Sequence, residues 1–158
     1  MRNVVLLLLA GAPRLAGAQA AAPAPTSAVT ELSGGMAVAL AHEVYAGPEL
    51  ALGRRSGQGR VALAVTGGWL ASSPAMRVEA RGQFLMLSPA RSAPGVYAGV
   101  GSALVASRQH HGSAYVSVVL GIETAAWQSR GWYGEVGLGG GVRLAAGVRL
   151  RQFPAWWP

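Results

Sequence analysis

One stretch of the chain contains the three residue types of a hydrolytic triad. His111 and Ser113 are followed by Glu123. A histidine base beside a serine nucleophile, oriented by a carboxylate, is the arrangement that activates a hydroxyl group for ester hydrolysis. Residues 115 to 122 have no turn residue except Gly121, so they predict one continuous strand. Ser113 and Glu123 would then lie about 33 Å apart, given the rise per residue of an extended strand. We therefore expect no enzymatic activity.

Other chemistry finds less support in the sequence. His42, His110 and His111 could bind a metal only if the first and sixth segments met, and the adjacent His110 and His111 would point apart in a strand. The chain has no cysteine, so it can form neither disulfides nor thiolate metal sites. The glycines at 139 to 141 and at 99 and 101 lack the strand-loop-helix context of a phosphate loop. We expect no metal and no cofactor.

The formal net charge is +7, but the basic residues are scattered. Arg54 and Arg55 form the only adjacent basic pair. Nucleic-acid binding usually needs basic residues gathered on one face together with stacking aromatic rings. We therefore expect no nucleic-acid partner.

The N-terminus has the three parts of a secretory signal peptide. Arg2 provides the positive charge, residues 4 to 10 form a short apolar core, and Ala16-Gly17-Ala18 is a small-x-small cleavage site. The apolar run is about half of the roughly 20 residues that a membrane helix needs, and Pro13 and Arg14 interrupt it. An N-terminal anchor helix is the alternative. We expect a signal peptide over 1–18, followed by a flexible Ala/Pro-rich leader over 19–30.

Beyond the leader, hydrophobicity alternates with a period of two. The clearest case runs from Met76 to Phe84, where Arg77, Glu79 and Arg81 interleave with apolar residues. Turn residues separate similar segments, among them Tyr45-Ala46-Gly47-Pro48, Ser72-Ser73-Pro74 and the glycines at 139–141. Eight strands are expected, at about 31–41, 49–55, 60–70, 76–84, 96–106, 113–123, 132–139 and 142–153.

These segments predict an all-β fold, an antiparallel up-and-down eight-stranded β-barrel over 31–153, with a C-terminal tail at 154–158. Two versions share this alternation: a soluble barrel or sandwich with a charged outer face, and a membrane barrel with an apolar outer face. The face opposite the apolar one is rich in Gly and Ala and carries both charge signs, and charged residues make up only 12% of the chain. Small residues suit the narrow interior of eight strands, which favours the membrane barrel.

Two sets of residues follow from that choice. The first is a structural network of charges facing the interior, which contains Arg77, Glu79, Arg81, Glu123, Glu135, Arg143, Arg149 and Arg151. The second is a set of aromatic residues near strand ends, where indole and phenol rings would sit at a membrane interface. These interfacial aromatics are Trp69, Tyr97, Tyr115, Trp127, Trp132 and Tyr133.

In this pattern the chain resembles the small eight-stranded outer-membrane barrels of the OmpA and OmpX kind. The resemblance covers residues 31 to 153 and rests on the signal peptide, the eight segments and the closing strand VRLAAGVRLRQF. It implies residence in the Gram-negative outer membrane, with membrane lipid and the barrel-insertion machinery as partners. In that family the last strand commonly ends in Phe, and Phe153 resembles this residue, although it shares the parity of Arg149 and Arg151. The connections are also shorter here than in many relatives.

The expected function is therefore a non-enzymatic outer-membrane barrel with a structural or minor-pore role. One alternative is an exported soluble β-barrel, periplasmic or secreted, that binds a small apolar ligand. Another is a lipid esterase, because the His-x-Ser pair and downstream Glu resemble those of the lipid A deacylases.

The signal peptide gives the first testable prediction. Cleavage is expected after Ala18, because Ala16 and Ala18 place small residues at the positions that signal peptidase reads. N-terminal sequencing of the exported protein should begin at Gln19. An exported chain that still begins at Met1 would contradict the assignment and favour the anchor helix.

Overall fold

A computed structural model describes residues 28–70, 72–87, 94–108, 112–124 and 126–153. The predicted signal peptide, the leader up to residue 27, His110, His111 and the tail at 154–158 lie outside these ranges. Among the described residues, no helix has the length and apolar character needed to cross a membrane.

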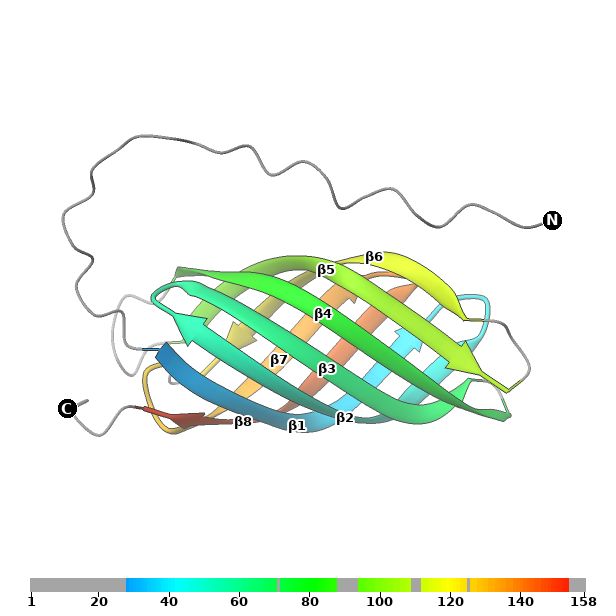
Figure 1. Ribbon diagram of the computed structural model, residues 1–158, viewed down its shortest axis with the longest axis horizontal. Coiled ribbons are helices and arrows are strands. Elements are labelled where there is room, and N and C mark those ends of the chain that lie inside the picture. The colour runs from blue at the N-terminus through cyan, green and yellow to red at the C-terminus, as the bar shows by residue number, and fades with distance from the viewer. Residues whose placement is uncertain (1–27, 71, 88–93, 109–111, 125, 154–158) are drawn as a thin grey trace.

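Eight strands form one closed barrel in which each strand pairs with its neighbours in the sequence and β8 pairs with β1 (Figure 1). Every pairing is antiparallel. The predicted all-β, up-and-down, eight-stranded barrel is therefore confirmed. The strands are β1 (Ala28–Leu40), β2 (Val44–Ser56), β3 (Gly59–Leu70), β4 (Ser73–Leu87), β5 (Gly95–Ser107), β6 (Ser113–Glu123), β7 (Arg130–Leu138) and β8 (Val142–Gln152).

The barrel has two distinct ends. β1 begins and β8 finishes at the same end (Figure 1), which we call the terminal end. The β2–β3, β4–β5 and β6–β7 connections lie there as well, because the strands run alternately up and down. The other four connections lie at the opposite end, which we call the loop end.

Two predicted turns are wrong, because the strands extend through them. Residues 45–48 belong to β2, and Ser73 and Pro74 belong to β4. Proline lacks the N–H that a strand interior normally needs. The β2–β3 register omits Gly47 and Pro48, and β4 pairs with β5 only from Ala75 onward. Each proline therefore lies where its strand lacks hydrogen-bonded pairing on one side: Pro48 on the side of β3, and Pro74 on the side of β5.

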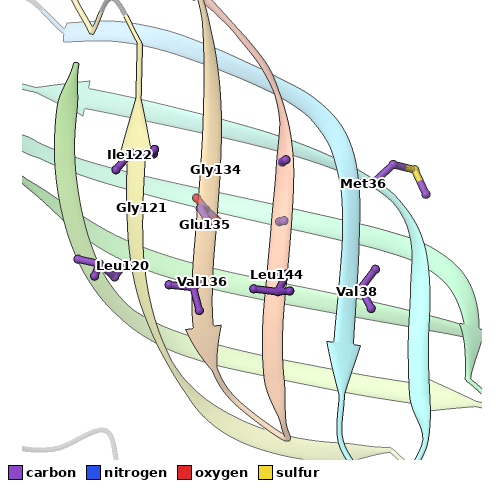
Figure 2. A pocket seen from close by; sticks show the side chains of 11 residues that line it. Met36, Val38, Leu120, Gly121, Ile122, Gly134, Glu135, Val136 and Leu144 are labelled. Atoms are coloured by element: carbon purple, nitrogen blue, oxygen red, sulfur yellow. The ribbon is translucent and has the colours of Figure 1, made fainter. Parts of the chain in front are cut away.

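The alternation seen in the sequence places charged side chains inside the barrel and large apolar side chains on its outer surface. In β8, Arg143, Arg149 and Arg151 are buried, whereas Leu144 and Leu150 are about half exposed. The same division holds on the other strands. Across β6, β7, β8 and β1, the side chains of Leu120, Val136, Leu144 and Val38 form one row on the outer surface (Figure 2).

The outer surface is apolar over all eight strands. Large hydrophobic side chains such as Val116, Leu50 and Ile122 are 79%, 66% and 62% exposed. A soluble protein rarely exposes a contiguous apolar surface of more than a few hundred Å². The alternative of a soluble barrel with an apolar core is therefore wrong, because the apolar face is the outer one.

Adjacent valines on β6 provide a matched test of this arrangement. Val118 is 50% exposed and Val119 is 2% exposed, and the chain has no native cysteine to interfere. In lipid bilayers, Val118→Cys should react with a lipid-soluble maleimide and resist a water-soluble one. Val119→Cys should resist both reagents until the protein is denatured. Equal reactivity of the two cysteines in the folded protein would contradict the inside-outside assignment.

Candidate functional site in the barrel interior

The inward faces of the strands carry a dense set of charges, which we call the interior network. Each of its members is at most 6% exposed. It consists of seven arginines and five glutamates: Arg55, Arg60, Arg77, Arg81, Arg143, Arg149, Arg151, Glu31, Glu49, Glu79, Glu123 and Glu135. All eight charged residues predicted to face the interior lie in this set. Glu31, Glu49, Arg55 and Arg60 belong to it as well and were not predicted.

Near the terminal end, Glu123 is surrounded by four arginines. Its carboxylate lies 2.9 Å from Arg60 Nη1, 3.1 Å from Arg151 Nη2 and 3.4 Å from Arg55 Nη1, and it also contacts Arg149. The four guanidinium groups compensate the negative charge of this buried carboxylate, so it needs no contact with solvent.

Glu31 shares all four of those cations, with Arg149 the most distant at 3.9 Å. It lies 3.0 Å from Arg60, 3.2 Å from Arg151 and 3.5 Å from Arg55. Arg151 is its direct neighbour across the β1–β8 pairing, so the strand that closes the barrel is fastened by this pair.

Toward the loop end, Glu135 is the corresponding centre. It accepts hydrogen bonds from Arg81 at 2.5 Å and Arg143 at 2.9 Å. Arg143 also contacts Glu49 and lies 3.8 Å from Glu79. Arginines therefore bridge neighbouring carboxylates, and the charges form a connected network.

Two of these contacts span the full width of the barrel. Arg55 on β2 reaches Glu123 on β6, and Arg143 on β8 reaches Glu79 on β4. Strands separated by four positions lie on opposite walls of an eight-stranded barrel. The network consequently cross-links walls that the backbone ladder leaves unconnected.

Arginines outnumber glutamates in the interior, and carbonyl groups take up some of the additional donors. Arg55 donates to the Ala126 carbonyl at 2.6 Å, Arg77 to the Gly139 carbonyl at 2.9 Å, and Arg151 to the Gln128 carbonyl at 3.2 Å. These carbonyls belong to the β6–β7 and β7–β8 connections. The excess cations thus hold the connections at both ends of the barrel against its interior.

The interfacial assignment of Tyr97 and Tyr133 is wrong, because both rings lie inside the barrel, 1% and 4% exposed. Tyr97 donates a hydrogen bond to Glu135 at 2.8 Å. The guanidinium of Arg149 lies 5.4 Å from the Tyr97 ring centre and 4.8 Å from that of Tyr133. Parity would have shown this: Tyr133 has the same parity as Glu135 on β7.

Trp127 also departs from the interfacial assignment. It lies in the β6–β7 connection, packs against Tyr97, Leu85 and Ala126, and stacks with Arg55 at 4.6 Å. Arg55 draws the ring inward over the terminal end, because a guanidinium and an indole face attract each other.

The remaining predicted aromatics are exposed. Trp69 at the loop end and Trp132 at the terminal end are 60% and 64% exposed and point outward. Tyr115 is 37% exposed at the rim, close to Gly140 of the β7–β8 connection.

Small residues make room for this network. A Cβ atom at Gly121 would lie 2.6 Å from the Tyr97 hydroxyl, so the tyrosine ring occupies the space that any larger residue would take. The cavity left among Glu31, Glu49, Arg60 and their neighbours is only about 10 Å³. This is about the space of one water molecule.

The hydrolytic triad is not assembled among the described residues. Ser113 is exposed at the loop end of β6, and Glu123 is buried at the terminal end of the same strand. Within the described ranges, no group of three or more His, Asp or Glu residues could hold a metal ion. His42 lies in the β1–β2 connection.

The fold and the interior define a closed eight-stranded barrel with a charged core and an apolar surface. Among solved structures, the chain is similar to Neisserial surface protein A, with 17% sequence identity and a TM-score of 0.59. The similarity covers 78% of this chain and 96% of that one. The expected resemblance to small eight-stranded outer-membrane barrels is therefore confirmed for the fold. No protein-family model and no curated protein sequence matches the chain.

Glu123 gives a direct test of the interior network. Glu123→Gln removes the charge that four arginines share, and loss of one partner from a buried ion pair costs about 3 kcal/mol or more. We expect the free energy of unfolding in detergent micelles, measured by urea titration, to fall by about that amount. Glu43→Gln in the β1–β2 connection is the control and should change it by less than about 0.5 kcal/mol. Equal effects of the two substitutions would contradict a stabilising role for the network.

Proposed function

We propose that the protein is a non-enzymatic barrel of the Gram-negative outer membrane with a structural role and no open pore. The observation that carries the proposal is the division of side chains between the two faces. Charges are paired inside, and large apolar residues cover the outside of every strand. In a bilayer, a strand can cross only as part of a closed barrel whose outer face is apolar.

The filled interior favours a structural role over a minor pore. Diffusion needs a continuous aqueous path, and barrels of eight strands are normally filled by their side chains. Here arginine side chains cross the interior, and the cavity among Glu31, Glu49 and Arg60 has about the space of one water molecule. A cavity of about 260 Å³ beside Tyr45 and Arg77 lies at the loop end only. Opening a path would require several buried ion pairs to separate together.

The comparison supports the cellular location. Neisserial surface protein A is, by its name, a surface protein, and this chain shares its fold at 17% identity. Membrane lipid and the barrel-insertion machinery are the partners that such a location would require. Phe153, which directly follows β8, would be part of the signal that the insertion machinery reads.

Cell fractionation and electrophoresis test this proposal. The mature protein should be found in the outer-membrane fraction. Because hydrogen bonds close the barrel, unheated samples should migrate differently from boiled ones in detergent gels. Recovery from the soluble periplasmic fraction would contradict the proposal.

Conductance measurements test the absence of a pore. In planar bilayers the purified barrel should produce no stable conductance steps. The double variant Arg55→Ala with Glu123→Ala removes a pair of side chains that spans the interior. It serves as the positive control, in which conductance steps are expected. Steady steps from the unaltered protein would exclude the closed-interior role and favour a minor pore.

A further inference from the structure

Only two charged side chains lie on the outward faces of the described strands, and both are arginines. Arg54 on β2 and Arg130 on β7 are exposed, and both lie near the terminal end. No outward strand position carries a carboxylate. The apolar surface is therefore bordered at this end by positive charge alone, which suits an anionic group of the surrounding lipid.

Arg54 has no partner within the described part of the chain. Its side chain takes part in no hydrogen bond, ion pair or ring contact there, in contrast to its buried neighbour Arg55. On the outer surface its neighbours toward β1 and the terminal end are polar. Thr30 lies directly opposite on β1, Gln152 lies beyond Thr30 on β8, and Ser56 follows on β2. All three are exposed, so they offer further hydrogen-bond donors beside the guanidinium.

Two apolar grooves meet at Arg54. The first, which we call the β3–β5 groove, has a volume of about 820 Å³ and is lined by Val61, Gly82, Phe84 and Val100. The second, the β2–β4 groove, has a volume of about 610 Å³. It is lined by Leu52, Val61, Leu63, Ala80 and Gly82.

The two grooves share three residues, Arg54, Val61 and Gly82. Val61 pairs with Arg54 on one side and with Gly82 on the other, so the three form one line across β2, β3 and β4. A ligand that fills both grooves therefore needs two apolar arms joined near one anionic group.

From this arrangement we propose that the outer face of β2 to β5 binds one glycerophospholipid. The phosphodiester is held by Arg54 with Thr30 and Ser56, and one acyl chain follows each groove. The inference rests on the proposed membrane location, and it adds a specific lipid site to it. The groove in Figure 2, about 560 Å³ and lined by Met36, Leu120, Val136 and Leu144, has no basic residue beside it and is not assigned a ligand.

Gly82 allows the grooves to be filled without disturbing the barrel. A Cβ atom there would meet only the Val100 carbonyl oxygen, at 3.9 Å. Gly82→Leu should therefore fold and occupy both grooves. Gly67→Leu is the matched control. Gly67 lies on β3, is exposed like Gly82, and has no atom within 4 Å of its Cβ position, but it lines neither groove. Arg130→Gln is the control for Arg54→Gln.

The test is native mass spectrometry of the refolded full-length mature protein in detergent micelles with added dioleoyl phosphatidylglycerol. We expect one bound lipid. Arg54→Gln should reduce its retention by about tenfold through loss of a charge-assisted contact, and Gly82→Leu should reduce it by a similar factor because the side chain occupies the grooves. Gly67→Leu and Arg130→Gln should retain it. Dioleoylglycerol, which lacks the phosphate, and glycerol phosphate, which lacks the chains, should both bind more weakly than the intact lipid.

Other results would overturn the site. Equal retention by all variants, or equal loss in the test and control variants, would show only a general lipid coat. Binding of glycerol phosphate as strong as that of the lipid would show an anion site without acyl recognition. Fractionation and gel mobility are measured on the same variants. A failed lipid site with normal outer-membrane fractionation would leave the proposed function standing, whereas loss of the fractionation result would remove both.

Discussion

The pairing of charges inside a barrel of eight strands is the interaction on which the rest of the structure depends. An isolated charge buried in this interior would be strongly destabilising, whereas a carboxylate such as Glu123, surrounded by four guanidinium groups, is compensated. Arginine suits this role because its planar group can contact several carboxylates at once. Small residues on the same faces, such as Gly121 beside Tyr97, are required because the long side chains need the central volume.

The period of two in the sequence was sufficient to predict the strands, their order and the inward position of residues such as Arg77 and Glu135. Parity carries that information, since a side chain cannot change faces without a bulge. Closeness to a strand end is a weaker guide than parity, because it places Tyr97 and Tyr133 at the interface although both rings lie inside. Counting parity from Glu135 places Tyr133 inside.

Strand ends were harder to predict, because local turn signals conflicted with the ladder. Gly47 and Pro48 predict a turn, yet β2 continues through them because both residues pair with β1, while the ladder to β3 is interrupted there. Glu49 and Arg55 alternate with Leu50 and Leu52 on one strand, so parity places them inside, but parity does not say which residues they meet. Arg55 meets Glu123, 68 positions away, and no local pattern relates the two.

A closed interior also determines where this barrel can interact with anything else. Between the two ends the space within is crossed by ion-paired side chains, so a ligand would have to break ion pairs in order to pass beyond the cavity at the loop end. The outer face has no such cost, because its apolar side chains are exposed and its two arginines lie at one end. Parity thus divides the side chains between two roles: inward residues hold the walls together, and outward residues form the apolar surface.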